Sequence, residues 1–268
     1  MTTFDPKRYW SDRLAKSYSL MGVGWLSLGE PFNRWMYRVR RQVFRRVARP
    51  LIAPLPAPAV LDIGSGTGFY VRCWQELGVR DLVASDLTDV AVAGLASAFP
   101  GVQSRALDVT EPLEPELEAG FDVVSAMDVL FHIVDDAAYE RALANLGRLV
   151  RPGGHLVLSE NFLHGPEQRG EHQVSRSIEH ITGLLRGAGL EPVSRVPMFV
   201  LMNTPVDEPK SLHRKAWDLI AAGAQRGRRG SAALGALLYP FELALVRWLK
   251  EGPSTEVMIC RRVGSTSS

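Results

Sequence analysis

Short apolar runs alternate with segments of helical periodicity through the middle of the chain, from about residue 59 to residue 160. The runs begin near residues 60, 81, 121 and 155, and a further short strand is expected near residues 102–106. Runs that are apolar throughout are typical of strands buried on both faces of a parallel sheet. Strands that alternate with helices predict a doubly wound α/β fold, in which ligands bind at the carboxyl ends of the strands.

The N-terminal region, residues 1–58, has the periodicity of helices. Glycines at Gly22 and Gly24 and the turn Gly29-Glu30-Pro31 interrupt it, and a proline-rich linker over residues 50–58 is expected to end it. These helices precede the first predicted strand, so they form a separate cap.

The region after residue 160 is predicted to end the sheet. The sequence predicts a loop over 161–172, a helix over 175–188 that ends at Gly189, a strand near 192–198 and a final β-rich run over 255–263. The interval between the last two strands is too long for a hairpin turn. Residues 203–250 are therefore expected to fold as helices and to form a second wall of the ligand pocket.

The first strand runs directly into a loop with three alternating glycines, Gly64, Gly66 and Gly68. Glycine permits a tight turn and lets the backbone approach a ligand closely. The helix that follows, roughly residues 70–77, points its free N–H groups into the turn. The sequence therefore predicts a loop for a nucleotide-type cofactor. A dinucleotide fingerprint requires Gly-x-Gly-x-x-Gly, so the spacing here disfavours a nicotinamide cofactor.

The loop Asp62-Ile63-Gly64-Ser65-Gly66-Thr67-Gly68 closely resembles motif I of the class I S-adenosylmethionine-dependent methyltransferases. The resemblance continues in order through segments 81–87, 107–109, 121–133 and 149–159. It implies S-adenosylmethionine as the cofactor and a Rossmann-like, seven-stranded, doubly wound sheet whose last strand is antiparallel. It also implies that residues 1–58 are a helical cap and that residues 59–268 are the methyltransferase domain, with residues 203–250 as a helical insertion before the last strand.

The same resemblance assigns residues to the cofactor. Asp86 is expected to accept hydrogen bonds from the ribose hydroxyls, and Asp108 from the adenine amino group. Met127 and Asp128 follow the fourth strand and should lie beside the cofactor. The cap residues expected to close over it are Tyr9, Trp10, Arg13 and Tyr18. The full set expected at the cofactor is Asp62, Gly64, Ser65, Gly66, Gly68, Asp86, Leu87, Asp108, Val109 and Met127.

Methyl transfer to a hydroxyl requires the acceptor to be held in line and its proton to be removed. The candidates for the base are His132, Glu160 and His172, which follow the fourth or fifth strand. For His132 a packing role, and for His172 a solvated loop position, remain open alternatives. His164, His172 and His180 are spaced by eight residues but lack short-spaced partners, so no metal is expected.

The predicted function is methyl transfer to a small or medium-sized acceptor, with oxygen favoured and a natural product, sugar or lipid-like molecule as the substrate class. Two alternatives stay open. One is a member that binds the cofactor without transferring a methyl group, such as a cyclase or a partner subunit, and the other is a nicotinamide-dependent oxidoreductase. The oligomeric state is not predicted.

Composition changes this interpretation little. The chain has 268 residues, 46% of them hydrophobic, and a formal net charge of +2, all ordinary for a globular protein. Cys73 and Cys260 lie far apart in sequence, and no secretory signal precedes the first helix, so a cytoplasmic location is expected. The longest apolar stretch, residues 232–249, is interrupted by Pro240, Glu242 and Arg247, so no transmembrane segment is predicted.

Two basic clusters, over residues 34–46 and 226–230, stand out from this ordinary composition. In the first, Trp35, Val39 and Val43 form an apolar stripe, which favours a packed surface helix. An anionic substrate or peripheral contact with a membrane remains an alternative. No RNA-reading motif accompanies the arginines, so nucleic acid is not expected as a partner.

Overall fold

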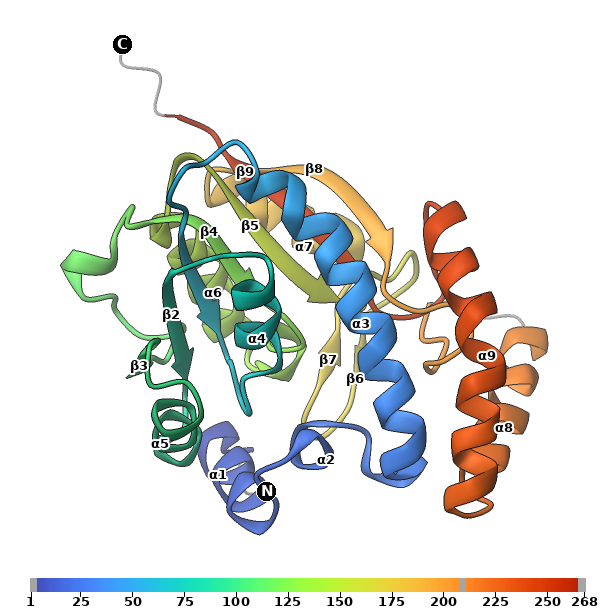
Figure 1. The fold of residues 1–268 in the computed structure, drawn as a ribbon. Coiled ribbons are helices and arrows are strands. Elements are labelled where there is room, and N and C mark those ends of the chain that lie inside the picture. The colour runs from blue at the N-terminus through green and yellow to red at the C-terminus, as the bar shows by residue number, and fades with distance from the viewer. Residues whose placement is uncertain (1–3, 208–210, 265–268) are drawn as a thin grey trace.

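The computed structural model describes residues 4–207 and 211–264, and a seven-stranded sheet forms its centre (Figure 1). The strand order is β3-β2-β1-β4-β5-β9-β8. β1 to β5 pair in parallel, whereas β9 runs antiparallel to both β5 and β8. The strands are β1 (Ala59–Ile63), β2 (Asp81–Asp86), β3 (Gln103–Ala106), β4 (Phe121–Ala126), β5 (Val150–Glu160), β8 (Leu190–Pro197) and β9 (Glu256–Arg262). The predicted fold, including the antiparallel last strand, is confirmed.

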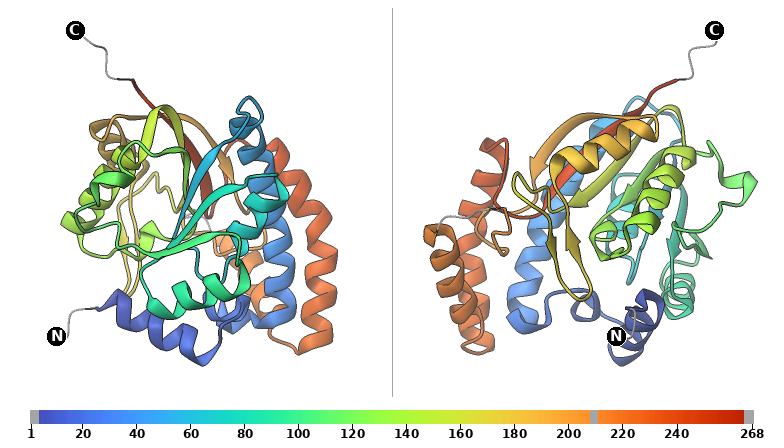
Figure 2. Two further views of the ribbon diagram at one scale, coloured as in Figure 1. Left: turned by 60° about the vertical axis from the view of Figure 1, so that its left-hand side comes forward. Right: turned by 180° about the vertical axis from the view of Figure 1, so that it is seen from behind.

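Helices cover both faces of the sheet, and each face has its own hydrophobic core. On one face α3 and α4 pack against the sheet, and α9 lies outside α3; α6 and α7 cover the other face (Figures 1 and 2). The helices are α1 (Pro6–Lys16), α2 (Leu20–Val23), α3 (Gly29–Ile52), α4 (Phe69–Glu76), α5 (Asp89–Ala98), α6 (Asp136–Leu149), α7 (Ile178–Gly187), α8 (Ser211–Ala224) and α9 (Arg228–Trp248), with short 3₁₀ turns at Leu26–Leu28, Pro115–Leu117 and Leu130–His132.

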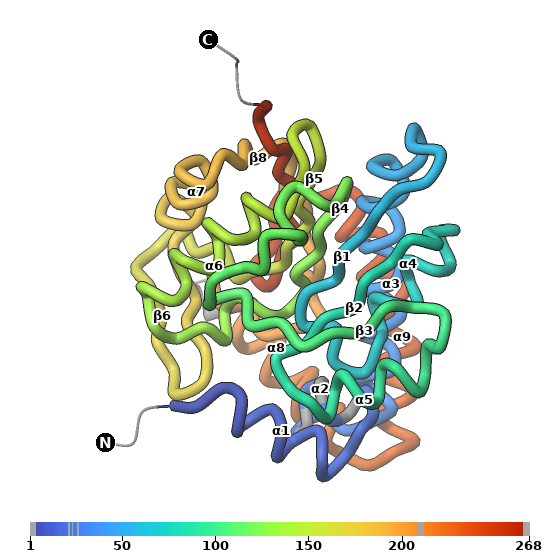
Figure 3. Tube along the Cα trace, turned by 90° about the vertical axis from the view of Figure 1, so that its left-hand side faces the viewer, coloured from blue at the N-terminus to red at the C-terminus, as the bar shows by residue number. Residues whose placement is uncertain are grey.

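The N-terminal region ends differently from the prediction. α3 continues through Pro50 to Ile52, so the proline-rich linker begins after residue 52 and not at Pro50. Pro50 lies in the last turn of the helix, where the missing N–H costs a single hydrogen bond. The tube view shows α1 crossing the molecule beside α5, at the carboxyl ends of the parallel strands (Figure 3).

Two further predictions need correction after β5. The expected loop over 161–172 contains β6 (Gln168–Arg169), which pairs with β7 (Val174–Ser175) in a small antiparallel hairpin. The following helix therefore begins at Ile178 rather than near residue 175, and the Ser177 side chain caps it by accepting from the N–H of His180.

Residues 203–250 contain two helices, α8 and α9, as predicted. The prediction that these helices form a second wall of the pocket is wrong. α9 packs along the outer side of α3, away from the cavity. Asn203, Thr204 and Val206, which precede the helices, do face the ligand cavity. In the described part of the chain, no helix has the length and apolar character required to cross a membrane.

Candidate functional site

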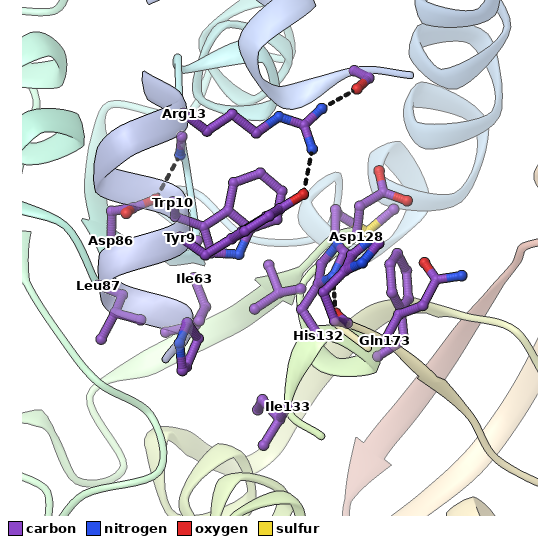
Figure 4. Close-up of a pocket in the computed structure, with 18 of the residues that line it drawn as sticks. Tyr9, Trp10, Arg13, Ile63, Asp86, Leu87, Asp128, His132, Ile133 and Gln173 are labelled. Atoms are coloured by element: carbon purple, nitrogen blue, oxygen red, sulfur yellow. Dashed lines mark hydrogen bonds between the residues drawn. The ribbon is translucent and has the colours of Figure 1, made fainter. Parts of the chain in front are cut away.

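A cavity of about 860 Å³ lies at the carboxyl ends of β1 to β5, beneath α1. Figure 4 shows Tyr9, Trp10 and Arg13 of α1 beside the strand-end residues Asp86 and Asp128. This position is the one at which parallel α/β sheets bind ligands. The volume is at the upper end of the usual range for small-molecule sites, so it has room for a cofactor and an acceptor together.

The glycine loop forms one wall of this cavity through Gly64, Ser65 and Gly66. Gly64 has a φ of +65°, and a Cβ there would approach a methyl carbon of Val129 to 2.4 Å. Gly68 has a φ of +81° and abuts the ring of Phe99, although it does not line the cavity. A side chain at either position would displace the loop or its neighbours.

Asp62 lies beneath the loop and does not reach the cavity surface. Its carboxylate accepts hydrogen bonds from the hydroxyls of Ser65, at 2.8 Å, and Ser125, at 2.5 Å. Burial raises the pKa of Asp62 to about 6. The structure therefore places Asp62 where it holds the loop in shape, whereas the sequence grouped it with residues at the cofactor.

Asp86 and Leu87 both line the cavity at the end of β2. One carboxylate oxygen of Asp86 accepts the N–H of Gly66 at 2.9 Å. The other accepts the N–H and the hydroxyl of Thr88, each at 2.9 Å. Asp86 thus ties the second strand to the glycine loop and presents a negative charge at the cavity.

Asp108 and Val109 line the cavity next to the end of β3. Oδ1 of Asp108 accepts the N–H of Thr110 at 2.9 Å and its hydroxyl at 2.7 Å. Oδ2 of Asp108 has no hydrogen-bond partner among the described residues. The apolar residues Leu87, Leu107 and Val109 line the same cavity. An acceptor beside apolar side chains fits an aromatic base that carries an amino group, so these groups fit a nucleoside cofactor.

Met127 and Asp128 also line the cavity, at the end of β4. Asp128 has a φ of +60° and forms an ion pair with Arg40 of α3. The hydroxyl of Tyr70 donates to the same carboxylate at 3.3 Å, and the Asp128 N–H donates to the hydroxyl of Ser159 at 2.7 Å. Contacts from α3, α4 and β5 therefore hold Asp128 in this unusual backbone conformation.

Arg40 is a cavity residue that the sequence did not single out, because residues 34–46 were predicted to form a packed surface helix. Its side chain is only 15% exposed. A signal was present in the sequence, since Asn33, Met36, Tyr37 and Arg40 follow helical spacing and all four line the cavity. Trp25, Asn203 and Thr255 also line it and carried no recognisable motif.

His132 and His172 are brought together at the cavity. Nδ1 of His132 donates to the backbone carbonyl of His172 at 2.9 Å. The two imidazole rings stack with centroids 6.0 Å apart, and Tyr9 stacks on His172 at 5.5 Å. Trp10 meets His132 edge-on at 4.9 Å. Burial lowers the pKa of His132 to about 4, so its ring is neutral at pH 7.

Glu160, the third predicted base, is not at the cavity. It is buried on the opposite face of the sheet, where the hydroxyl of Tyr139 donates to it at 3.1 Å. Burial raises the pKa of Glu160 to about 8. The next residue, Asn161, faces the cavity instead, because successive side chains of a strand alternate between its faces.

Of the cap residues expected to form a lid, three line the cavity and Tyr18 contacts the glycine loop. Tyr9, Trp10 and Arg13 line the cavity, and Arg13 donates to the hydroxyl of Tyr9 at 3.1 Å. The hydroxyl of Tyr18 donates to the carbonyl of Gly66 at 3.1 Å. Tyr18 therefore joins the cap to the glycine loop, whereas Tyr9 and Trp10 contact His172 and His132.

The spaced histidines do not converge. His164 contacts Asp207, His180 contacts Glu167 at 2.9 Å, and His172 lies at the cavity. Within residues 4–207 and 211–264, no group of three His, Cys, Asp or Glu side chains is arranged to hold a metal ion.

Known proteins resemble this chain in sequence and in fold. Residues 61–158 match a family model described as a methyltransferase domain. The ubiquinone biosynthesis O-methyltransferase of Cereibacter sphaeroides is 32% identical over 184 residues, which cover 60% of this chain and 72% of that protein. The enzyme of the same description from Ralstonia nicotianae is 30% identical over 166 residues, 52% of this chain and 66% of that protein. The match thus spans about two thirds of these relatives.

A solved structure supports the fold over a larger part of the chain. The N-methyltransferase NodS of Bradyrhizobium japonicum, in complex with S-adenosylhomocysteine, has a TM-score of 0.56 to this structure. The likeness covers 96% of this chain and 97% of that chain, at 18% identity. At this identity the likeness concerns the fold.

Proposed function

The chain belongs to the class I S-adenosylmethionine-dependent methyltransferase family, and on this premise we propose that it transfers a methyl group to a hydroxyl oxygen of a small or medium-sized acceptor. One observation carries the proposal: a single cavity holds the carboxylates of Asp86 and Asp108 and the neutral ring of His132. The relatives named as O-methyltransferases support oxygen as the acceptor atom. Natural products, sugars and lipid-like molecules are the acceptor classes that we propose.

Asp86 and Asp108 would hold the cofactor. The Asp86 carboxylate would accept hydrogen bonds from the ribose hydroxyls, and the free oxygen of Asp108 would accept from the adenine amino group. Bound S-adenosylmethionine supplies an activated methyl group on its sulfonium. The loop from Gly64 to Gly66 allows close approach, because it has no side chain at its glycines.

His132 would remove the acceptor's proton. Because Nδ1 donates to the carbonyl of His172, Nε2 carries the lone pair of the neutral ring. Nε2 has no hydrogen-bond partner among the described residues, so it can accept a proton from a bound hydroxyl. The backbone and ring of His172 orient His132, which makes His172 a positioning residue. Glu160 takes no part in this proposal, because it does not reach the cavity.

Two measurements test the proposal in sequence. Calorimetric titration should show binding of S-adenosylmethionine and S-adenosylhomocysteine but not of NADH. Acceptor panels of phenols, catechols, sugars and hydroxylated lipids are then screened for S-adenosylhomocysteine release. Cofactor binding without release from any acceptor would favour the non-methylating alternative.

Replacement of the base distinguishes its role from packing. His132→Ala should lower kcat by about 10²- to 10⁴-fold, the usual contribution of a general base, and leave the Kd of S-adenosylhomocysteine unchanged. His180→Ala, on the outside of the molecule, is the matched control. In the wild type, kcat should be constant from about pH 5 upwards and fall as the pH approaches 4, because only the unprotonated ring accepts a proton. A His132→Ala variant with the kcat of the wild type would overturn the assignment.

A further inference from the structure

The outer side of α9 carries a row of exposed apolar side chains. Leu237 is 64% exposed, Phe241 59% and Trp248 79%. Their spacing of four and seven residues places them on one face of the helix. Large apolar side chains in a contiguous exposed row mark an interaction surface more often than isolated ones do.

The opposite side of α9 packs against the rest of the protein. The exposed row points away from that contact, so it does not stabilise the fold. Gly235 lies so close to Trp35 of α3 that a Cβ would reach the indole at 2.3 Å. Glu242 is buried, and its carboxylate accepts the N–H groups of Val200 at 2.6 Å and Leu201 at 2.7 Å. These contacts fix the rotation of α9 and therefore the direction of the exposed row.

Positive charge accompanies the row. Arg229 and Arg247 are both exposed and are 18 residues apart, about five helical turns, so they lie along the same flank at the two ends of the row. Neither has an ion-pair partner among the described residues. The other exposed basic residues of α8, α9 and their ends are Arg214, Lys215, Arg226, Arg228 and Lys250, against the exposed acids Asp218 and Glu251.

We propose that this face of α9 docks on an anionic lipid bilayer. Leu237, Phe241 and Trp248 enter the interface, and Arg229 and Arg247 contact lipid phosphates. Leucine, phenylalanine and tryptophan flanked by arginine are the composition of helices that lie in the plane of a membrane surface. Basic residues beside the row add attraction to anionic headgroups, whereas an uncharged partner would gain nothing from them.

α9 lies at one side of the molecule, where a membrane surface could reach it. The helix lies away from β2 and β3, with α8 beside it and α3 on its inner side, towards the sheet (Figures 1 and 2). α8 also carries an exposed apolar side chain, Leu219. The inference is independent of the proposed acceptor and of catalysis, because neither helix lines the cavity.

Vesicle flotation of the full chain tests the proposal. The protein should float with vesicles that contain phosphatidylglycerol, bind pure phosphatidylcholine weakly, and dissociate as salt increases. Phe241→Ser with Trp248→Ser, and separately Arg229→Glu with Arg247→Glu, should each weaken binding on the order of tenfold or more. Val193→Ser is the matched control, since Val193 is 61% exposed on β8.

The variants should have the thermal unfolding temperature and the affinity for S-adenosylhomocysteine of the wild type. These two measurements distinguish a loss of membrane binding from a loss of folding. Absence of the wild type from floated anionic vesicles at low salt would overturn the proposal. So would undiminished flotation of the Phe241/Trp248 double variant. Light scattering that shows a dimer abolished by the same two substitutions would assign the row to a second copy of the chain.

Discussion

Asp86 and Asp108 lie at neighbouring strand ends but use their oxygens differently. Both oxygens of Asp86 accept hydrogen bonds from the loop or from Thr88, whereas only Oδ1 of Asp108 is engaged, by Thr110. A substitution at Asp86 would therefore disturb the glycine loop as well as ligand binding. At Asp108, in contrast, replacing the free oxygen Oδ2 alone tests whether this residue binds the cofactor.

Asp108→Asn should retain the contacts of Oδ1 and replace the free oxygen with an amino group. That group would face the amino group of adenine, so the affinity for S-adenosylhomocysteine should fall by about 1–3 kcal/mol. S-inosylhomocysteine, with a carbonyl oxygen in place of the amino group, should bind the variant better than the wild type. Calorimetry with both ligands measures the switch, and an unchanged preference between them would remove Asp108 from the adenine site.

At the level of elements, α1 contributes far more to the cavity than to the core. Leu14 is its one buried residue, whereas Pro6, Tyr9, Trp10, Arg13 and Leu14 all line the cavity. Apart from the Lys7–Asp89 ion pair, which is exposed, few polar contacts join α1 to the sheet domain. A helix held in this way is of low local stability, as expected for an element that opens for ligand exchange.

Removal of residues 1–18 should therefore leave the sheet folded and weaken binding of S-adenosylhomocysteine on the order of tenfold or more, since several ligand-facing side chains and the Tyr18 contact to Gly66 are lost. Circular dichroism should retain the mixed α/β signal, with the unfolding temperature only a few degrees lower. Calorimetry gives the affinity. A truncated chain that binds as tightly as the full chain would show that α1 is not a lid, and Tyr18→Phe serves as the milder variant if truncation prevents folding.

The same scale shows what the sequence could predict. The strands were readable because β1 and β4 are mostly apolar, interrupted by Asp62 in β1 and by Asp122 and Ser125 in β4, and their order followed from the family resemblance. The β6–β7 hairpin was not, because each strand has two residues and leaves no periodic signal. Arg40 looked like its neighbouring arginines until the packing of Val39 and Val43 turned it to the cavity. Glu160 was misplaced by one position, which in a strand means the opposite face.

At the scale of the whole molecule, the two cores differ in the ionisable groups that they enclose. The face covered by α6 and α7 holds Glu160, whose pKa burial raises to about 8, and the sheet interior holds Asp62, whose pKa burial raises to about 6. Both carboxyls keep a proton in the folded chain at pH values where the unfolded chain has released it. His132 acts in the opposite direction, because its folded pKa of about 4 lies below that of an unfolded histidine.

These shifts set a window for stability. Because the folded pKa of Glu160 lies above the unfolded value of about 4.3, its contribution is complete below that value and is lost as the pH rises towards 8. Between pH 5 and 8 the loss amounts to up to about 4 kcal/mol. The contribution of His132 is lost in the other direction, as the pH falls from about 6.5 to about 4. Stability should therefore be greatest on the acidic side of neutrality.

Glu160→Gln isolates the larger of these effects. Glutamine has the shape of the protonated carboxyl and can hydrogen-bond to Tyr139, but it does not ionise. Urea unfolding from pH 5.5 to 8.5 should give a free energy of unfolding that declines less steeply in the variant, so that its stability relative to the wild type improves with pH. Glu179→Gln, at an exposed position of α7, should leave the slope unchanged. Parallel slopes for Glu160→Gln and the wild type would mean that Glu160 is ionised in the folded chain and paired with the buried Arg176.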